Sequence, residues 1–136
     1  MDRVDDAICA TRAALEEGIV TGGGVTYLQA QSTLDMTNLG DNILYKVLQF
    51  PIRCICENAG IAADVVINTI LSNTNINYGY NALINKYMDL RDAGIIDPAK
   101  VARVALENSA SVAGILLTSG CVIVDEDNIQ QQNVLY

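Results

Sequence analysis

Apolar residues recur at steps of three and four along most of the chain, which is the spacing of one face of an α-helix. This pattern predicts helices over residues 2-17, 25-33, 41-58, 61-72 and 98-118. Pro51 is expected to kink or divide the third helix, because proline lacks the backbone N–H that a helix interior uses. Short β segments are predicted at 78-82 and 120-124. The expected fold class is therefore mainly α, a helical bundle with a short β-hairpin and a C-terminal β-strand.

The residues between these segments are typical of turns and helix caps. Gly18 is expected to close the first helix, and three consecutive glycines, Gly22 to Gly24, form a loop that permits positive φ and close backbone approach. Asp97 before Pro98 is a strong helix start, with the aspartate as N-cap. The segment Cys121 to Val124 reads as a lone strand, and a strand needs a partner that this chain does not obviously offer.

Composition and net charge argue against several classes of function. The 136 residues include 16 acidic and 8 basic side chains, which gives a formal charge of −8. Such a chain has no basic stripe for phosphate backbones, so no nucleic acid partner is expected. No window of about 20 apolar residues is free of charges or amides, so no membrane insertion is expected, and the N-terminus lacks the features of a secretory signal. With 51% hydrophobic residues, the chain should fold or bury its apolar faces against a partner.

The four cysteines do not make a metal-binding pattern. Cys9, Cys54, Cys56 and Cys121 contain a single Cys-x-Cys pair, and the chain has no histidine. Zinc sites need a second pair of ligands at defined spacing. The cysteines are therefore expected to be reduced core thiols, and the chain itself is expected to hold no metal site.

Several polar features are individually weak signals. Asp5-Asp6 on the first helix is usually a solvated face, Gly22 to Gly24 is usually a flexible turn, and Asp97 is adequately explained as a cap. The segment Asn77-Tyr78-Gly79-Tyr80-Asn81-Ala82 is a fourth unusual feature. Their order and spacing along the chain carry more information than any one of them.

Taken together, these motifs closely resemble the group I chaperonin family, the bacterial and organellar 60-kDa type. The likeness runs through Arg3 to Gly24, then Asn77 to Ala82, Gly94 to Val101 and Ala110 to Gly114 in the right order. It matches only the C-terminal part of that family. The resemblance implies that residues 1-17 are the end of an intermediate-domain helix, that 18-124 are the C-terminal half of an equatorial, ATP-binding and ring-contact domain, and that 125-136 are a polar tail.

The resemblance also implies a function, which is part of an ATP-dependent protein-folding chaperonin, an ATPase when complete. Its cofactors would be ATP and Mg²⁺, with the metal ligands mostly outside these residues. Asp6 matches the catalytic carboxylate that positions the attacking water. The residues matched to nucleotide binding are Gly23 in the loop against the nucleotide, Asn81, Ala82 and Leu83 lining the adenine pocket, Ile95 packing on the base, and Asp97 accepting ribose hydroxyl bonds.

Two departures from the family pattern affect this expectation. Leu83 stands where the family usually has a small residue, which tightens the adenine pocket or shifts its backbone. The glycine-rich phosphate cradle with its metal-binding aspartate is not visible in these residues. The isolated chain is therefore expected to have no ATPase activity.

The expected partners follow from the same resemblance. They are other chaperonin subunits in a homo-oligomeric ring, doubled in the family, with unfolded clients and co-chaperonin engaged only through domains outside these residues. The compartment would be the bacterial cytoplasm, or the mitochondrial matrix or plastid stroma. The alternative is a truncated, non-catalytic subunit that docks onto full-length chaperonin through its equatorial faces and the strand Cys121 to Val124, or an inert small acidic helical domain.

Overall fold

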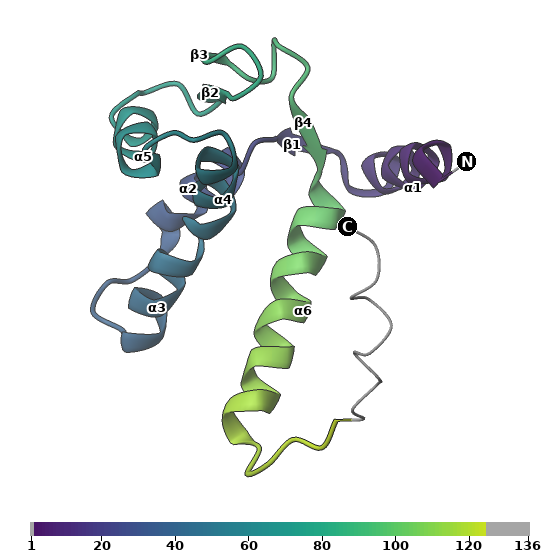
Figure 1. Cartoon of the computed structure of the whole chain (residues 1–136), viewed down its shortest axis with the longest axis vertical. Helices are drawn as coiled ribbons and strands as arrows, with labels where there is room; N and C mark the ends of the chain where they lie inside the picture. Colours follow the sequence, from purple (N-terminus) through teal and green to yellow (C-terminus); the bar gives the residue numbers. More distant parts are fainter. Residues whose placement is uncertain (1, 125–136) are drawn as a thin grey trace, which may run out of the picture. The chain divides into compact units, whose positions relative to one another are not determined.

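A computed structural model describes residues 2–124, so the polar tail expected at 125-136 lies outside the described residues. Figure 1 shows helices joined by two small pieces of antiparallel sheet. The elements in chain order are α1 (Asp2–Glu17), β1 (Ile19–Thr21), α2 (Val25–Ala30), the 3₁₀ turn η1 (Gln31–Thr33), α3 (Leu39–Val47), α4 (Phe50–Asn58), α5 (Ala63–Leu71), β2 (Tyr78–Asn81), β3 (Lys86–Asp89), β4 (Ile96–Pro98) and α6 (Ala99–Thr118). The expected fold class, mainly α with a short hairpin, is confirmed.

The helical periodicity located every helix of the described chain to within a few residues. The long helix predicted over 41-58 is divided into α3 and α4, and Pro51 lies in the first turn of α4, where its missing N–H costs nothing. The cap of α3 is Asn38, whose side chain accepts a hydrogen bond from the Gly40 N–H. Proline therefore acts here as a start signal for a new helix.

The two β pieces were only partly predicted. Strands β2 and β3 form the expected hairpin, with Tyr80 opposite Tyr87. Strands β1 and β4 pair antiparallel, with Val20 opposite Asp97 and Thr21 opposite Ile96. Since α6 begins at Ala99 and Asp97 lies within a strand, the N-cap interpretation of Asp97 is wrong. A three-residue strand is too short for an alternating pattern to be seen in the sequence.

The strand predicted at 120-124 is not formed. Residues 121–124 have no regular secondary structure, and Val122, Ile123 and Val124 are all strongly exposed. A β-strand is stabilised by hydrogen bonds to a neighbouring strand, and the described chain does not supply one here. The β-branched residues of this segment favour a strand, but the described chain provides no neighbouring strand for it to pair with.

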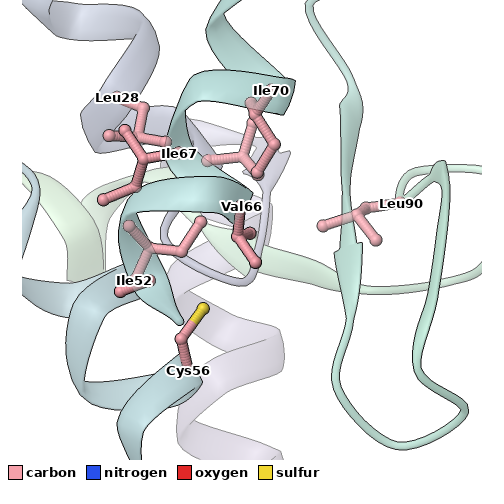
Figure 2. Close-up of a cluster of buried hydrophobic side chains, with 9 residues drawn as sticks. Leu28, Ile52, Cys56, Val66, Ile67, Ile70 and Leu90 are labelled. Carbon is pink, nitrogen blue, oxygen red and sulfur yellow. The ribbon is translucent and has the colours of Figure 1, made fainter. Parts of the chain in front are cut away.

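The core gathers side chains from α2, α4 and α5 with one residue that follows β3. Figure 2 shows these apolar side chains directed toward one another. The buried members are Val25, Leu28, Ile52, Cys56, Ala63, Val66, Ile67, Ile70 and Leu90. Of the four cysteines, only Cys56 belongs to this core. Cys9 and Cys121 are exposed and Cys54 is half-buried, so the expectation of core thiols is wrong for most of them.

The described chain divides into two units, and the boundary lies within α6 between Arg103 and Val104. In the second unit, the apolar residues of α6 are exposed, Val112 by 55% and Leu117 by 88%. Of the helices within residues 2–124, none combines the length and apolarity that a membrane span requires.

Within the first unit, two ion pairs join the end of α1 to the start of α6. Lys100 pairs with Glu16, and Arg103 donates from Nε and Nη2 to the two carboxylate oxygens of Glu17, at 3.0 and 2.6 Å. The Arg103 hydrogen bonds, opposed by partial desolvation, hold the pKa of Glu17 below its ordinary value. A bidentate guanidinium fixes orientation as well as distance, so this pair aligns the two helix ends.

Gly24 should be the position in the glycine loop least tolerant of a side chain. Its φ is +79°, and an added Cβ would lie 2.9 Å from the Ile52 backbone nitrogen. Gly60 has a similar φ of +71° but has open space around it. We expect Gly60→Ala to lower the free energy of unfolding by about 1–2 kcal/mol through backbone strain alone. Gly24→Ala should cost a further ~1–3 kcal/mol through overpacking, measured by urea denaturation, and equal losses would contradict this packing.

Removing the Arg103 guanidinium should bring the pKa of the Glu17 carboxyl back toward its ordinary value. In Arg103→Gln, we expect the pKa of Glu17 to rise, followed by NMR titration of its carboxyl carbon. Because the folded-state pKa is lowered, the stabilisation by this pair is present at neutral pH and is lost as the pH falls below about 4.3. Arg12→Gln, on the exposed face of α1, is the control, and a Glu17 titration unchanged by Arg103→Gln would refute the assignment.

Candidate functional site

The glycine loop after β1 is attached to the segment that leads into β4. The Gly22 N–H donates to the Ile95 carbonyl at 3.0 Å, and the Val25 N–H donates back to the Gly22 carbonyl at 3.3 Å. Gly23 follows with a φ of +66°, and a Cβ there would lie 4.0 Å from the Ile95 side chain. Two of the residues matched to nucleotide binding, Gly23 and Ile95, are therefore brought together.

Asp97 lies two residues beyond Ile95, in β4 opposite Val20, and is exposed. Its negative charge reaches Tyr27 on α2. Burial first, and the charge of Asp97 second, raise the pKa of Tyr27, whose hydroxyl donates to the Ala102 carbonyl at 3.0 Å. The Asp97 carboxylate thus lies in the neighbourhood of α2 and the start of α6, in the antiparallel ribbon of β1 and β4 that leads into the glycine loop.

Asn81, Ala82 and Leu83 lie at the end of β2 and in the hairpin turn that follows. The Asn81 side chain accepts the Leu83 N–H at 3.0 Å and contacts the Met88 sulfur at 3.9 Å. The Leu83 side chain is 91% exposed. The hairpin is linked to the other site residues through Leu90, whose N–H donates to the Asn77 carbonyl and whose carbonyl accepts the Ile95 N–H at 2.8 Å.

A side-chain hydrogen bond joins the two halves of this region. The Thr21 hydroxyl donates to Asn77 Oδ1 at 2.6 Å, and Thr21 is only 8% exposed. Reasoning from the sequence missed both the strand and this bond. The β-branched run Ile19-Val20-Thr21 was the available signal for the strand, but nothing in the sequence indicates the partner of the hydroxyl.

Asp6 stands apart from the other predicted residues. It is exposed on α1, and in the described part of the chain its side chain makes no hydrogen bond or ion pair with them. Helix α1 meets the ribbon farther along, around a shallow cavity of about 190 Å³. The cavity is lined by Ala10, Thr11, Ala14, Ile19, Ile96 and Pro98. Asp6 precedes Ala10 by one turn, roughly 6 Å along the helix axis.

These residues fit one side of a nucleotide better than the other. Ile95 offers a half-buried apolar surface for a base, and Asp97 offers an exposed carboxylate that can accept hydroxyl hydrogen bonds. On the phosphate side, the Gly22 and Val25 amides already have backbone partners, so these two N–H groups are not available to a phosphate. Within residues 2–124, no group of three His, Cys, Asp or Glu side chains is placed to hold a metal ion. The arrangement suits base and ribose recognition.

Comparison with known proteins agrees with this architecture. The family model described as the TCP-1/cpn60 chaperonin family matches residues 1–127. Among solved structures, the chain is similar to a group III chaperonin crystallised in the open state, with 25% identity and a TM-score of 0.69. That match covers 82% of this chain and 25% of the other, so the chain spans about a quarter of that relative's length. The fold is like a chaperonin equatorial domain, and the chain belongs to the TCP-1/cpn60 chaperonin family.

Proposed function

We propose that this chain is part of a group I, ATP-dependent protein-folding chaperonin and supplies the adenine and ribose side of its nucleotide site. The observation that carries the proposal is that Gly23, Ile95 and Asp97 lie in or directly beside the β1–β4 ribbon, in a chain whose residues 1–127 match the chaperonin family model. In this proposal residues 1-17 end an intermediate-domain helix, and residues 18-124 belong to the equatorial domain.

Each residue has a distinct role in the proposed site. Ile95 packs against the face of the adenine base, and Asn81, Ala82 and Leu83 line its edge. Asp97 accepts hydrogen bonds from the ribose hydroxyls, which suits a carboxylate whose oxygens are exposed. Gly23 lets the loop lie close to Ile95, because a Cβ there would meet the Leu90 side chain at 3.2 Å and displace it slightly.

Asp6 is proposed as the residue that acts on the attacking water. Phosphoryl transfer depends on an oriented nucleophile and on neutralising the charge of the phosphates, with Mg²⁺ bridging them. A carboxylate on an exposed helix face can accept a hydrogen bond from that water and orient it toward the phosphate. The phosphate and metal contacts are proposed to come from groups other than those of this chain, so the chain alone would bind nucleotide weakly and not turn it over.

The proposed partners are further chaperonin subunits in a ring, and the ring would hold unfolded clients. This rests on the family membership and on the apolar surface that the second unit exposes, which includes Val112, Leu117 and Ile123. Exposed apolar surface of this kind is typical of a face that another protein covers.

Titration with ADP tests the nucleotide site directly. We expect ADP to shift the backbone amide NMR signals of Ile95, Asp97 and Asn81, with a Kd on the order of 1 mM because the phosphate side is weak. Asp97→Ala should weaken binding about tenfold, as expected for loss of a hydrogen bond to a charged group. Asp92→Ala is the matched control, since Asp92 is an exposed aspartate in the neighbouring turn.

Two outcomes of the titration would contradict the proposal. The absence of any shift at Ile95, Asp97 and Asn81 would refute the proposed site. Equal weakening by the two aspartate substitutions would refute the role of Asp97, because it would show a general effect of charge.

A second candidate function is docking onto complete chaperonin rings without catalysis. The observation that favours it is the segment 121–124, which has a strand-forming sequence, no strand partner in the described chain, and exposed side chains. Such a segment can add a strand to the open edge of another protein's sheet.

Co-elution with intact rings at micromolar concentration tests this docking. We expect the chain to elute with the rings, and Ile123→Asp to abolish co-elution because a buried charge opposes sheet addition. Leu83→Asp is the control, since Leu83 is 91% and Ile123 92% exposed but Leu83 lies in the hairpin turn. Elution of the unmodified chain apart from the rings would rule out docking.

A further inference from the structure

The hydroxyl of Thr21 makes an unusual bond for this chain. It donates to Asn77 Oδ1 at 2.6 Å across 56 positions of sequence, from a side chain that is only 8% exposed. Other threonine hydroxyls bond close by in sequence, as in Thr11 to Ala7 and Thr69 to Val65. Thr21 therefore joins two distant segments, whereas Thr11 and Thr69 bond only within their own helices.

The two segments joined are those that carry the proposed site. Thr21 ends β1 and precedes Gly23 by two residues, and Asn77 precedes β2, whose last residue is Asn81. The next amide after Thr21, that of Gly22, binds the Ile95 carbonyl, and Thr21 lies opposite Ile96 in the ribbon. The bond thus fixes the glycine loop and Ile95 on one side against the base of the hairpin on the other.

The bond is also held rigidly at both ends. The Thr21 carbonyl accepts the hydroxyl of Thr26 at 2.6 Å, and the Asn77 carbonyl accepts the Leu90 N–H at 2.9 Å. The Asn77 N–H in turn donates to the Asn75 side chain at 2.9 Å. Because these bonds hold the backbones of both partners, the side-chain bond between Thr21 and Asn77 contributes to the spacing of those backbones.

We propose that Thr21 and Asn77 are positioning residues of the nucleotide site, which set the width of the gap between the Gly23–Ile95 side and the Asn81 hairpin where the adenine base would bind. The inference rests on the proposed nucleotide-binding function and deepens it, since neither residue touches the base. Loss of the hydroxyl leaves the Asn77 oxygen without its donor, so the hairpin base is expected to shift outward and the gap to widen.

The test measures ADP affinity by NMR titration of the full chain, together with nucleotide-free amide shifts and the melting temperature. Thr21→Val keeps the shape of the side chain and removes the donor. It should weaken ADP binding by about five- to thirtyfold and move the Asn81 amide signal in the absence of nucleotide. Thr21→Ser keeps the hydroxyl and should restore both. Thr69→Val is the matched control, because its hydroxyl bonds the Val65 carbonyl within α5 and does not join two distant segments.

The outcomes separate this inference from the proposed function. If the unmodified chain binds ADP and Thr21→Val binds equally well, the inference is overturned and the nucleotide site stands. If Thr21→Val and Thr69→Val lose affinity equally, or if Thr21→Ser fails to restore it, the role is one of general stability and the inference is again overturned. If the unmodified chain does not bind ADP, the proposed function itself fails and takes the inference with it. Should Thr21→Val not fold, Asn77→Ala removes the same bond from its other end.

Discussion

Packing of Leu90 against two glycines is the constraint on which the first unit depends. Its side chain is fully buried, and a Cβ at Gly79 would lie 2.5 Å from it, while a Cβ at Gly23 would lie 3.2 Å away. The same residue uses its N–H to hold the Asn77 carbonyl and its carbonyl to hold the Ile95 N–H. The glycine loop, the hairpin and the approach to β4 are therefore all placed relative to one side chain, because close-packed interiors leave little room for adjustment.

This arrangement gives the glycines a different meaning from a phosphate-binding loop. In a phosphate cradle, glycine leaves backbone amides free to point at the ligand. Here the Gly22 amide is bonded to Ile95, and the nearest atoms to an added Cβ at Gly24 belong to Ile52. The loop is tightly packed against its own protein, so it would form a fixed wall beside the proposed base. Such a wall is useful to binding because it need not be ordered when the ligand arrives.

The sequence predicted the elements that repeat and missed those that are short or depend on distant partners. Helices of more than two turns display their periodicity, so α1, α5 and α6 were found nearly to their ends. Strands β1 and β4 have three residues each, too few to show alternation, and this is why Asp97 was mistaken for a cap. The resemblance pointed to Gly23, Ile95 and Asp97, and in the structure these residues lie in or directly beside the β1–β4 ribbon. Thr21 could not be found, since its partner is decided only by the tertiary fold.

The exposed apolar residues of the second unit indicate that contacts with another protein would add to its stability. Helix α6 continues past Arg103 with apolar residues at helical spacing, yet none of its residues is buried. Isolated helices draw little stability from propensity alone, and most helical stability in proteins comes from packing an apolar face. Leu116 and Leu117 are 56% and 88% exposed, and Ile123 beyond the helix is 92% exposed. A net charge of −8 keeps such a chain soluble without covering these side chains. These side chains are therefore where contact with another protein would add most to stability.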